Sequence, residues 1–338
     1  MIYPVVIRPL LFQLDAERAH DFTLKSLSRF AKSHTLTRTL HAITGHESPV
    51  NLMGLRFPNR VGLAGGLDKN GVAVAAWWAL GFGFVELGTV TPRPQQGNPQ
   101  PRMFRFPQQR SILNRMGFNN HGAEAVAARL ATLTNRPAFP IGISVGKQGT
   151  TPVDDVPAVI ADYVEAAVKL APQADFISIN VSSPNTSGLR SLQTSDTLTA
   201  LVTTVKNAIG AKPLLVKVAP ELSGNDLHTV VDAVMYSGAA GLIATNTLQQ
   251  FDEAGKSIGG LSGKPLKELA PQRVEAIRKF APSAAVIGCG GIDDVASARR
   301  MIDAGADLVQ VYTGLVYEGP GLIGRLSRGL SRTATTAS

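Results

Sequence analysis

The sequence has 338 residues, 44% hydrophobic and 17% charged, which is enough for one large α/β domain with a small appendage. Its single cysteine, Cys289, excludes an internal disulfide and a multi-cysteine metal site, so we expect no metal and a reducing compartment. The formal net charge of +8 favours an anionic partner, but the chain has no zinc-ligand spacing, aromatic RNA-binding motif or dense Lys/Arg block, so we expect no nucleic acid.

The first 48 residues differ in pattern from the rest. Residues 3–14 (YPVVIRPLLFQL) and 16–32 (AERAHDFTLKSLSRFAK) indicate two short amphipathic helices, and the second has a broad apolar face and a basic remainder. Such a pair can lie in a membrane interface or cap the following domain, and the pattern leaves both open. We find no signal peptide and no apolar stretch of the roughly 20 residues needed to cross a bilayer. We therefore divide the chain into residues 1–48 and 49–338.

Beyond residue 55 one theme repeats: a short apolar run, a polar or glycine-rich tip, then a helical segment. The eight predicted strands are Val61–Ala64, Phe84–Thr89, Ile141–Val145, Phe176–Val181, Leu214–Val218, Gly241–Thr245, Ala285–Gly288 and Leu308–Tyr312. Predicted helices between them include Val156–Leu170, Leu198–Ile209, Asp226–Ser237, Pro271–Phe280 and Asp294–Ala304.

Strands that alternate with helices predict parallel β-α units, and eight of them favour an α/β fold of the closed (β/α)8 TIM-barrel type. An open doubly wound sheet is the alternative, but no G-x-G-x-x-G motif opens the first unit. Barrel enzymes carry their active sites at the carboxyl ends of the strands. We therefore expect the chemistry at those tips.

The tips are polar throughout. They read AGGLDKNG (64–71), GTVTPR (88–93), SVGKQ (144–148), NVSSPN (180–185), KVAP (217–220), TNT (245–247), GCGGI (288–292) and YTG (312–314). Glycines in the last two tips, with a helix beginning near Asp294, predict a phosphate cradle; ordinary glycine turns are the alternative. The segment NVSSPNT (180–186) fits either a plain turn or a reaction site.

Nine stretches, in order along the chain, resemble the quinone-dependent (class 2) dihydroorotate dehydrogenases. They are GLAGGLDKNG (62–71), ELGTVTPRPQQGNPQPRMFR (86–105), LNRMGFNNHG (113–122), INVSSPNTSGLRSLQ (179–193), LVKVAP (215–220), IATNT (243–247), GGLSGKPL (259–266), IGCGGI (287–292) and LVQVYTG (308–314). The resemblance covers essentially the whole chain, including the helical N-terminus.

The resemblance implies an FMN-dependent barrel that oxidises (S)-dihydroorotate to orotate in pyrimidine (UMP) biosynthesis. A hydride passes to N5 of FMN, a proton passes to a serine base, and the electrons continue to a membrane quinone. It also implies a monomer held on the cytoplasmic face of the cell membrane by its N-terminal two-helix extension. Deleting residues 1–45 is then expected to spare flavin reduction by dihydroorotate and to cripple reoxidation by quinone.

Functional residues follow from the resemblance by motif. The implied catalytic base is Ser183. Implied substrate contacts are Lys69, Asn114, Arg115, Met116, Gly117, Phe118, Asn180, Asn185, Asn246 and Thr247. Implied FMN contacts are Ala64, Gly65, Gly66, Thr89, Ser144, Asn180, Lys217, Thr245, Gly263, Gly291, Tyr312 and Thr313. The implied quinone tunnel is formed by His20, Arg105 and Tyr312.

Two positions depart from the family pattern. Ser144 stands where asparagine is usual, so one hydrogen bond near the flavin ring is expected to weaken or rearrange. The first tip reads GLAGG where GLAAG is commoner, which we expect to be tolerated. No His or acid lies within 180–186 to activate Ser183, so we expect a threonine or water relay for its proton and turnover that rises with pH.

Other functions remain as alternatives. A flavin-dependent 2-hydroxy-acid oxidase would need a histidine base, and no strand tip offers one. A phosphate-handling isomerase or aldolase would not need the N-terminal helices or four asparagines. A membrane-peripheral binding protein would leave the polar tips unexplained.

Overall fold

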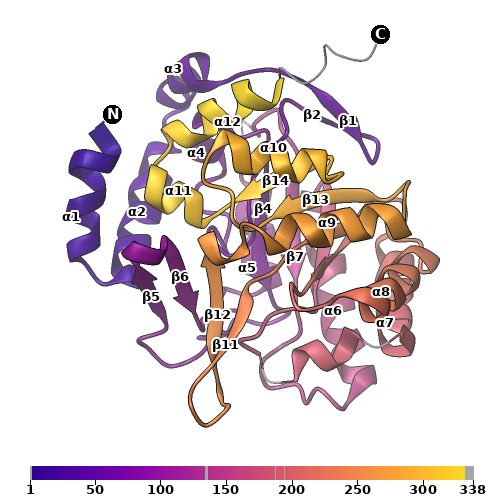
Figure 1. Cartoon of the computed structure of the whole chain (residues 1–338). Coiled ribbons are helices and arrows are strands. Elements are labelled where there is room, and N and C mark those ends of the chain that lie inside the picture. The colour runs from indigo at the N-terminus through magenta and orange to yellow at the C-terminus, as the bar shows by residue number, and fades with distance from the viewer. Residues whose placement is uncertain (1, 134–135, 187, 194, 332–338) are drawn as a thin grey trace.

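The eight predicted strands form a closed parallel barrel. The structure, a computed structural model, describes residues 2–133, 136–186, 188–193 and 195–331. Around the barrel the strand order is β10-β13-β14-β3-β4-β7-β8-β9 (Figure 1). The bounds are β3 Val61–Leu63, β4 Phe84–Val90, β7 Ile141–Val145, β8 Phe176–Asn180, β9 Leu214–Val218, β10 Gly241–Ala244, β13 Ala285–Cys289 and β14 Leu308–Val311. The predicted (β/α)8 architecture is confirmed.

Helices surround the barrel. They are α4 Val74–Ala79, α5 Ala123–Ala131, α6 Val156–Leu170, α7 Ser195–Ile209, α8 Gly224–Tyr236, α9 Leu269–Phe280, α10 Val295–Asp303, α11 Thr313–Glu318 and α12 Gly321–Ser331. Short 3-10 turns lie at η2 Pro107–Gln109, η3 Ala171–Gln173, η4 Leu189–Gln193 and η5 Lys264–Leu266. The five helices predicted from periodicity are confirmed, with shifts only at their ends.

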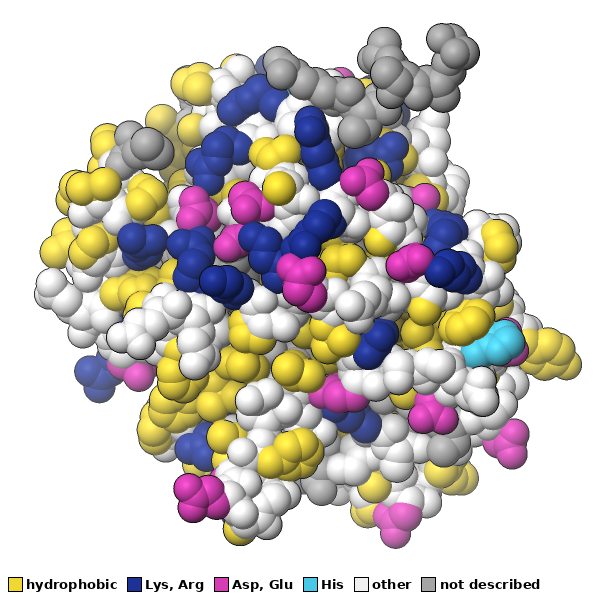
Figure 2. All heavy atoms as spheres, in the orientation of Figure 1, with side chains coloured by type: hydrophobic (Ala, Val, Ile, Leu, Met, Phe, Trp, Pro, Cys, Tyr) yellow, Lys and Arg dark blue, Asp and Glu magenta, His cyan; other side chains and the backbone are white. Residues whose placement is uncertain are grey.

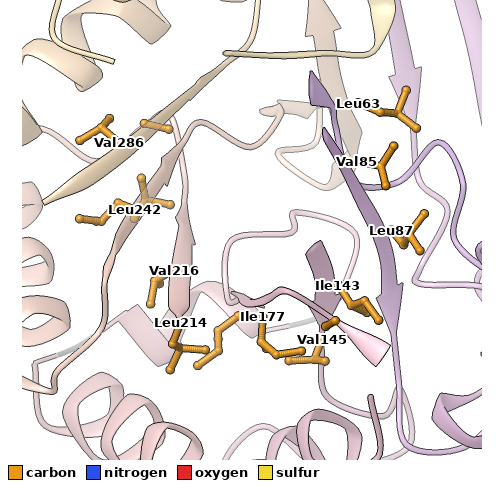
Figure 3. Close-up of a cluster of buried hydrophobic side chains, with 14 of the residues drawn as sticks. Leu63, Val85, Leu87, Ile143, Val145, Ile177, Leu214, Val216, Leu242 and Val286 are labelled. Atoms are coloured by element: carbon orange, nitrogen blue, oxygen red, sulfur yellow. The ribbon is translucent and has the colours of Figure 1, made fainter. Parts of the chain in front are cut away.

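Alternation along the strands separates two cores. Val85 and Leu87 belong to the large outer cluster between strands and helices, part of which Figure 3 draws, whereas Phe84 belongs to a separate cluster inside the barrel. Glu86 shares the inward parity of Phe84 and is fully buried. The same parity brings Asn180 and Lys217 inward at the carboxyl ends of β8 and β9, which positions the polar tips around one space.

The amino end of the barrel is closed by aromatic side chains. Phe57, from the hairpin β1 (Val50–Leu52) and β2 (Leu55–Phe57), meets Phe84 edge-on at a centroid distance of 5.4 Å. Phe84 in turn meets Phe176 at 6.4 Å. A Cβ at Gly62 would lie 2.2 Å from the Phe84 ring, so only glycine leaves room for this packing.

The N-terminal extension contains three helical segments rather than two. A π-turn, η1 (Tyr3–Ile7), runs into α1 (Arg8–Gln13), and α2 (Ala16–Phe30) follows, as predicted. The prediction missed α3 (His34–Thr44), because its threonines and histidines have weak helix propensity. Tertiary contacts compensate: the His41 ring stacks on Trp78 of α4 at 3.8 Å.

The extension also exposes apolar side chains. Those at least two-fifths exposed are Ile2, Val5, Val6, Ile7, Leu10, Leu14, Phe22, Leu36 and Ile43. Figure 2 shows hydrophobic side chains gathered along the edge where Figure 1 places α1. On the apolar face of α2, Phe22 is 60% exposed, whereas Ala19 is buried.

None of the helices in the described parts of the chain has the length and apolarity required to cross a bilayer.

A second, antiparallel sheet covers the carboxyl end of the barrel. Its order is β11-β12-β6-β5, with bounds β11 Leu248–Phe251, β12 Ser257–Gly263, β6 Ser111–Asn114 and β5 Met103–Phe106. It was not predicted. Its strands form two local hairpins, β5-β6 and β11-β12, in the loops after β4 and β10, and only the pairing of β12 with β6 joins distant parts of the sequence. The sheet turns the open end of the barrel into a covered cavity.

Candidate active site

A cavity with about 1160 Å³ of empty space, including its mouth, lies between the barrel tips and the antiparallel sheet. Most of the residues expected to bind substrate or cofactor line it. These are Ala64, Gly65, Gly66, Lys69, Thr89, Asn114, Met116, Gly117, Phe118, Asn180, Asn185, Lys217, Thr245, Asn246, Thr247, Gly263, Gly291, Tyr312 and Thr313. Ser183 lines it too. Residues from nearly every part of the chain therefore converge on one space.

Four asparagines that line this cavity form two hydrogen-bonded pairs. Asn185 donates from Nδ2 to Asn114 Oδ1 at 2.9 Å, and Asn246 donates from Nδ2 to Asn180 Oδ1 at 3.1 Å. The amides thereby hold one another in fixed orientations and keep further donor and acceptor positions for a bound molecule. The arrangement suits a small ring with alternating N–H and C=O groups.

Ser183 is 5% exposed and lines the same cavity. Its Oγ accepts a hydrogen bond from the backbone N–H of Asn185 at 3.2 Å. Among the described residues that line the cavity there is no histidine, and the one carboxylate, Asp293, is paired with Lys267 at 2.8 Å. The hydroxyl has therefore no acid or imidazole partner in the cavity.

Lys69 is a buried lysine in the cavity wall and is expected to contact the substrate. Its Nζ donates to the carbonyl of Gly66 at 2.9 Å. Burial and the nearby Arg102 lower the pKa of Lys69 to about 8, while Glu17 and Asp21 on α2 act in the opposite direction. An anion bound beside Lys69 would restore the charge that burial disfavours.

Lys217 is held by a carboxylate beneath the cavity. Its Nζ lies 3.5 Å from Oε2 of Glu86. Burial lowers the pKa of Lys217, but Glu86 and Cys289 together raise it and the net shift of the pKa is upward, so the lysine stays charged. Glu86 also accepts from Ser178 Oγ at 2.5 Å and from the backbone N–H of Gly65 at 3.1 Å. This buried ion pair thus holds the Lys217 side chain in place at the cavity.

Ser144 acts through its neighbour rather than on the cavity, which it does not line. Its Oγ lies 3.1 Å from Thr89 Oγ1, which accepts from Asn180 Nδ2 at 2.9 Å. The Ser144 hydroxyl, at the position where the resemblance leads us to expect asparagine, therefore supports Thr89 and, through it, Asn180.

The glycine-rich end of the cavity has the features of an anion cradle. Gly291 and Thr313 line it, and a Cβ at Gly291 would lie 2.4 Å from the Cα of Lys267. The expected donor helix near Asp294 is otherwise engaged, because the Asp294 carboxylate caps α10 by accepting from the N–H of Ser297 at 2.7 Å. Arg110 and Lys264 supply positive charge at the cavity wall.

Several buried polar atoms of residues that line the cavity lack hydrogen-bond partners. Among the described residues, Gln310 Oε1 and Nε2, Thr247 Oγ1 and Asn185 Oδ1 are buried without a hydrogen-bond partner, and all three residues line the cavity. Buried polar groups are nearly always satisfied, so these atoms are available for hydrogen bonds to a bound ligand or to water.

Four expected residues lie elsewhere. Besides Ser144, these are Arg115, His20 and Arg105, which do not line the cavity. Arg115 is exposed and its guanidinium donates to the carbonyl of Pro101 at 2.9 Å, so its side chain does not reach a substrate in the cavity.

The three residues expected at a quinone tunnel lie at the extension side. Burial and the charge of Lys69 lower the pKa of His20 to about 3, so it is neutral. The Arg105 guanidinium lies 4.4 Å from the Phe12 ring centroid and donates to the carbonyls of Leu11 and Leu14. Tyr312 lines the cavity and also packs on an apolar cluster that contains Ala16.

Sequence reasoning missed Glu86, Ser178 and Gln310. Each is a polar residue at an inward position of an otherwise apolar strand, one layer below the tip. The alternation of inward and outward side chains along FVELGTV (84–90) and LVQVY (308–312) could have indicated Glu86 and Gln310. Cys289 also lines the cavity, and burial raises the pKa of its thiol.

Comparisons with known proteins agree with this picture. The family described as Dihydroorotate dehydrogenase matches residues 48–333. A dihydroorotate dehydrogenase (quinone) of Chloroflexus aurantiacus is 45% identical, covering 98% of this chain and 96% of the relative. One of Salinispora arenicola is 46% identical, covering 98% and 100%. A crystal structure of DHODH from Eimeria tenella in complex with ferulenol superposes with a TM-score of 0.82 at 35% identity, covering 94% and 90%. The chain belongs to the dihydroorotate dehydrogenase family.

Proposed function

We propose that this enzyme oxidises (S)-dihydroorotate to orotate in de novo UMP synthesis and passes the electrons to a membrane quinone. The observation that carries the proposal is the cavity itself, where four asparagines, Lys69 and Ser183 converge in a chain of this family. The 2-hydroxy-acid oxidase alternative loses support, because no histidine is among the described residues of the cavity wall.

The residues present fit FMN. The unpartnered Gln310 amide and the charged Lys217 line the cavity and could hydrogen-bond a flavin ring, and the Gly291 and Thr313 end with Lys264 suits its phosphate. When bound, FMN supplies the acceptor for the hydride that leaves C6 of dihydroorotate. Glu86 holds Lys217 in place, and Ser144 holds Thr89 against Asn180.

The asparagines and Lys69 bind and orient the substrate. Orotate carries two carbonyls, two ring N–H groups and a carboxylate, and the linked carboxamides offer complementary donors and acceptors. Lys69 is the cation for the carboxylate. Fixing the ring in this way holds C5 toward Ser183 and C6 toward the acceptor.

Ser183 removes the proton from C5. A neutral hydroxyl is a weak base, so its own proton must pass onward as the C–H bond breaks. The buried, unpartnered Thr247 Oγ1 in the same cavity supports a threonine or water relay. The hydrogen bond from the Asn185 N–H to Ser183 Oγ stabilises negative charge that develops on this oxygen.

The extension is the membrane and quinone side of the enzyme. Its exposed apolar residues support a peripheral contact with the cytoplasmic face of the membrane. An apolar cluster that joins Phe12, Ala16 and Tyr312 supports a route for quinone from α1 to the cavity, near Arg105 and His20. We propose residues 1–48 as this unit, residues 49–338 as the catalytic unit, and a monomer as the working form.

An anaerobic titration tests the substrate and cofactor. The purified protein is expected to carry a flavin spectrum, to release FMN on denaturation and to bleach with one equivalent of dihydroorotate while forming orotate. Flavin that stays oxidised would remove the substrate. A colourless protein that does not take up FMN would remove the redox function.

A further inference from the structure

A buried ion pair joins the N-terminal extension to the catalytic unit. Arg102, which precedes β5, donates from Nη2 to Oε1 of Glu17 on α2 at 2.7 Å and from Nε to both carboxylate oxygens. The two side chains are 10% and 9% exposed. Leaving either partner alone would strand a buried charge, which is costly.

The same arginine also hydrogen-bonds to the backbone of the loop after β4. Arg102 Nη1 donates to the carbonyl of Gln96 at 2.5 Å and to that of Asn98 at 2.9 Å. Its guanidinium therefore spans from the carboxylate on α2 to the backbone of residues 96–98. Because a guanidinium is planar and its donors are fixed, the position of Glu17 sets the position of this loop.

The loop in turn contacts the segment that carries the proposed base. Asn98 Nδ2 donates to the carbonyl of Asn185 at 3.1 Å and to that of Arg115 at 2.9 Å. Asn185 donates from its N–H to Ser183 Oγ and from its Nδ2 to Asn114 Oδ1. A continuous series of contacts thus runs from α2 to Ser183 and to the side-chain amides of Asn185 and Asn114.

Charge adds a second link. Glu17 and Asp21, both on α2, favour the charged form of Lys69, whereas Arg102 opposes it. With the Glu17 carboxylate removed, the Arg102 charge would act on the buried lysine without its counter-charge. The extension therefore also balances the cation proposed to bind the substrate carboxylate.

We propose that Glu17 is a positioning residue for dihydroorotate oxidation, acting through Arg102 and Asn98 on Asn185, so that α2 is part of the substrate site as well as of the quinone side. This inference rests on the proposed substrate site. It changes the expectation for deleting residues 1–45: the loss should impair flavin reduction by dihydroorotate and not only reoxidation by quinone.

A double-mutant cycle in the FMN-loaded full-length protein tests the link. Glu17→Ala and Asn98→Ala are each expected to weaken orotate binding, measured by calorimetry, about tenfold. Since both act on one series of contacts, the double variant should be no weaker than the weaker single variant. Additive losses, or single variants that bind orotate as the wild type does, would overturn the inference.

Controls separate positioning from mere loss of stability. Asp15→Ala removes the N-cap that accepts from the N–H groups of Glu17 and Arg18, so it should lower the melting temperature and leave orotate affinity within about twofold. An equal loss of affinity in Asp15→Ala would attribute the effect to loosening of α2 and contradict the proposal. Glu17→Asp, which keeps the charge, should recover part of the affinity. A wild-type protein that does not bind orotate would instead overturn the proposed function.

Discussion

Ser183 illustrates how the surroundings of one residue decide its chemistry. Buried beside Asn185 and without an acid or imidazole from the described cavity wall, its hydroxyl can accept the C5 proton only if it releases its own. Turnover at saturating substrate is therefore expected to rise with pH.

Replacing this serine tests its role directly. Ser183→Ala should slow flavin reduction by dihydroorotate about 10²- to 10⁴-fold, the usual contribution of a general base, with FMN retained. Ser183→Cys should keep part of the rate and move its pH dependence to lower values, because a thiol ionises more readily. Stopped-flow absorbance measures both, and fast reduction in Ser183→Ala would remove Ser183 as the base.

Lys69 gives a separate pH dependence, in binding. Its pKa in the protein is about 8, so the lysine is charged below pH 8 and loses its proton as the pH rises through that value. Orotate is an anion and binds the charged form, so its Kd should be flat below pH 8 and rise by up to about tenfold per pH unit above it. Calorimetry between pH 6.5 and 9.5 measures this, with Lys69→Met as the control that should bind weakly at every pH. A wild-type Kd unchanged up to pH 9.5 would contradict the role of Lys69.

At the scale of elements, the first helices expose apolar side chains that we propose contact the membrane. Val5 is 72% and Leu10 60% exposed, and neither has a packing role that would explain an apolar side chain there. Val5→Gln with Leu10→Gln is expected to weaken sedimentation with phosphatidylglycerol vesicles about tenfold or more, because less apolar area enters the interface. Tyr236→Gln, on α8 and 87% exposed, is the matched control and should bind vesicles like the wild type. Equal loss in both variants would argue against a specific membrane edge.

Whether an element could be predicted from the sequence depends on how far apart in the chain its contacting residues lie. The barrel strands and their helices have local periodicity, and both were predicted. The antiparallel sheet and α3 depend on partners distant in the chain, such as β12 against β6 and His41 on Trp78, and no local pattern encodes those partners.

The residues of the site likewise fall into those that the sequence predicts and those that it does not. Residues at strand tips, such as Lys69, Asn180 and Asn246, could be predicted because they stand in motifs. Arg115 stands in a motif too, yet its side chain turns to Pro101. The Glu17–Arg102 pair joins residues 85 positions apart, and nothing in either segment indicates the other.

For the whole molecule, an aromatic cluster and the candidate active site lie at opposite ends of the barrel. The Phe57, Phe84 and Phe176 cluster fills the amino end, and the cavity opens at the carboxyl end. Phe84→Ala should lower the free energy of unfolding by about 3–5 kcal/mol, because it leaves a cavity in a packed core. Orotate affinity below the melting temperature should stay close to that of the wild type. Denaturant unfolding and calorimetry measure the two, and a large loss of affinity would show that the ends are coupled.

We propose that one chain takes electrons from dihydroorotate at the barrel and delivers them to quinone at the extension. Sequential mixing under anaerobic conditions tests it most directly: the protein is first reduced with one equivalent of dihydroorotate and then mixed with a soluble ubiquinone analogue. We predict bleaching of the flavin in the first step, with one orotate formed, and rapid return of its colour in the second. Flavin that dihydroorotate leaves oxidised, or reduced flavin that quinone fails to reoxidise, would contradict the account.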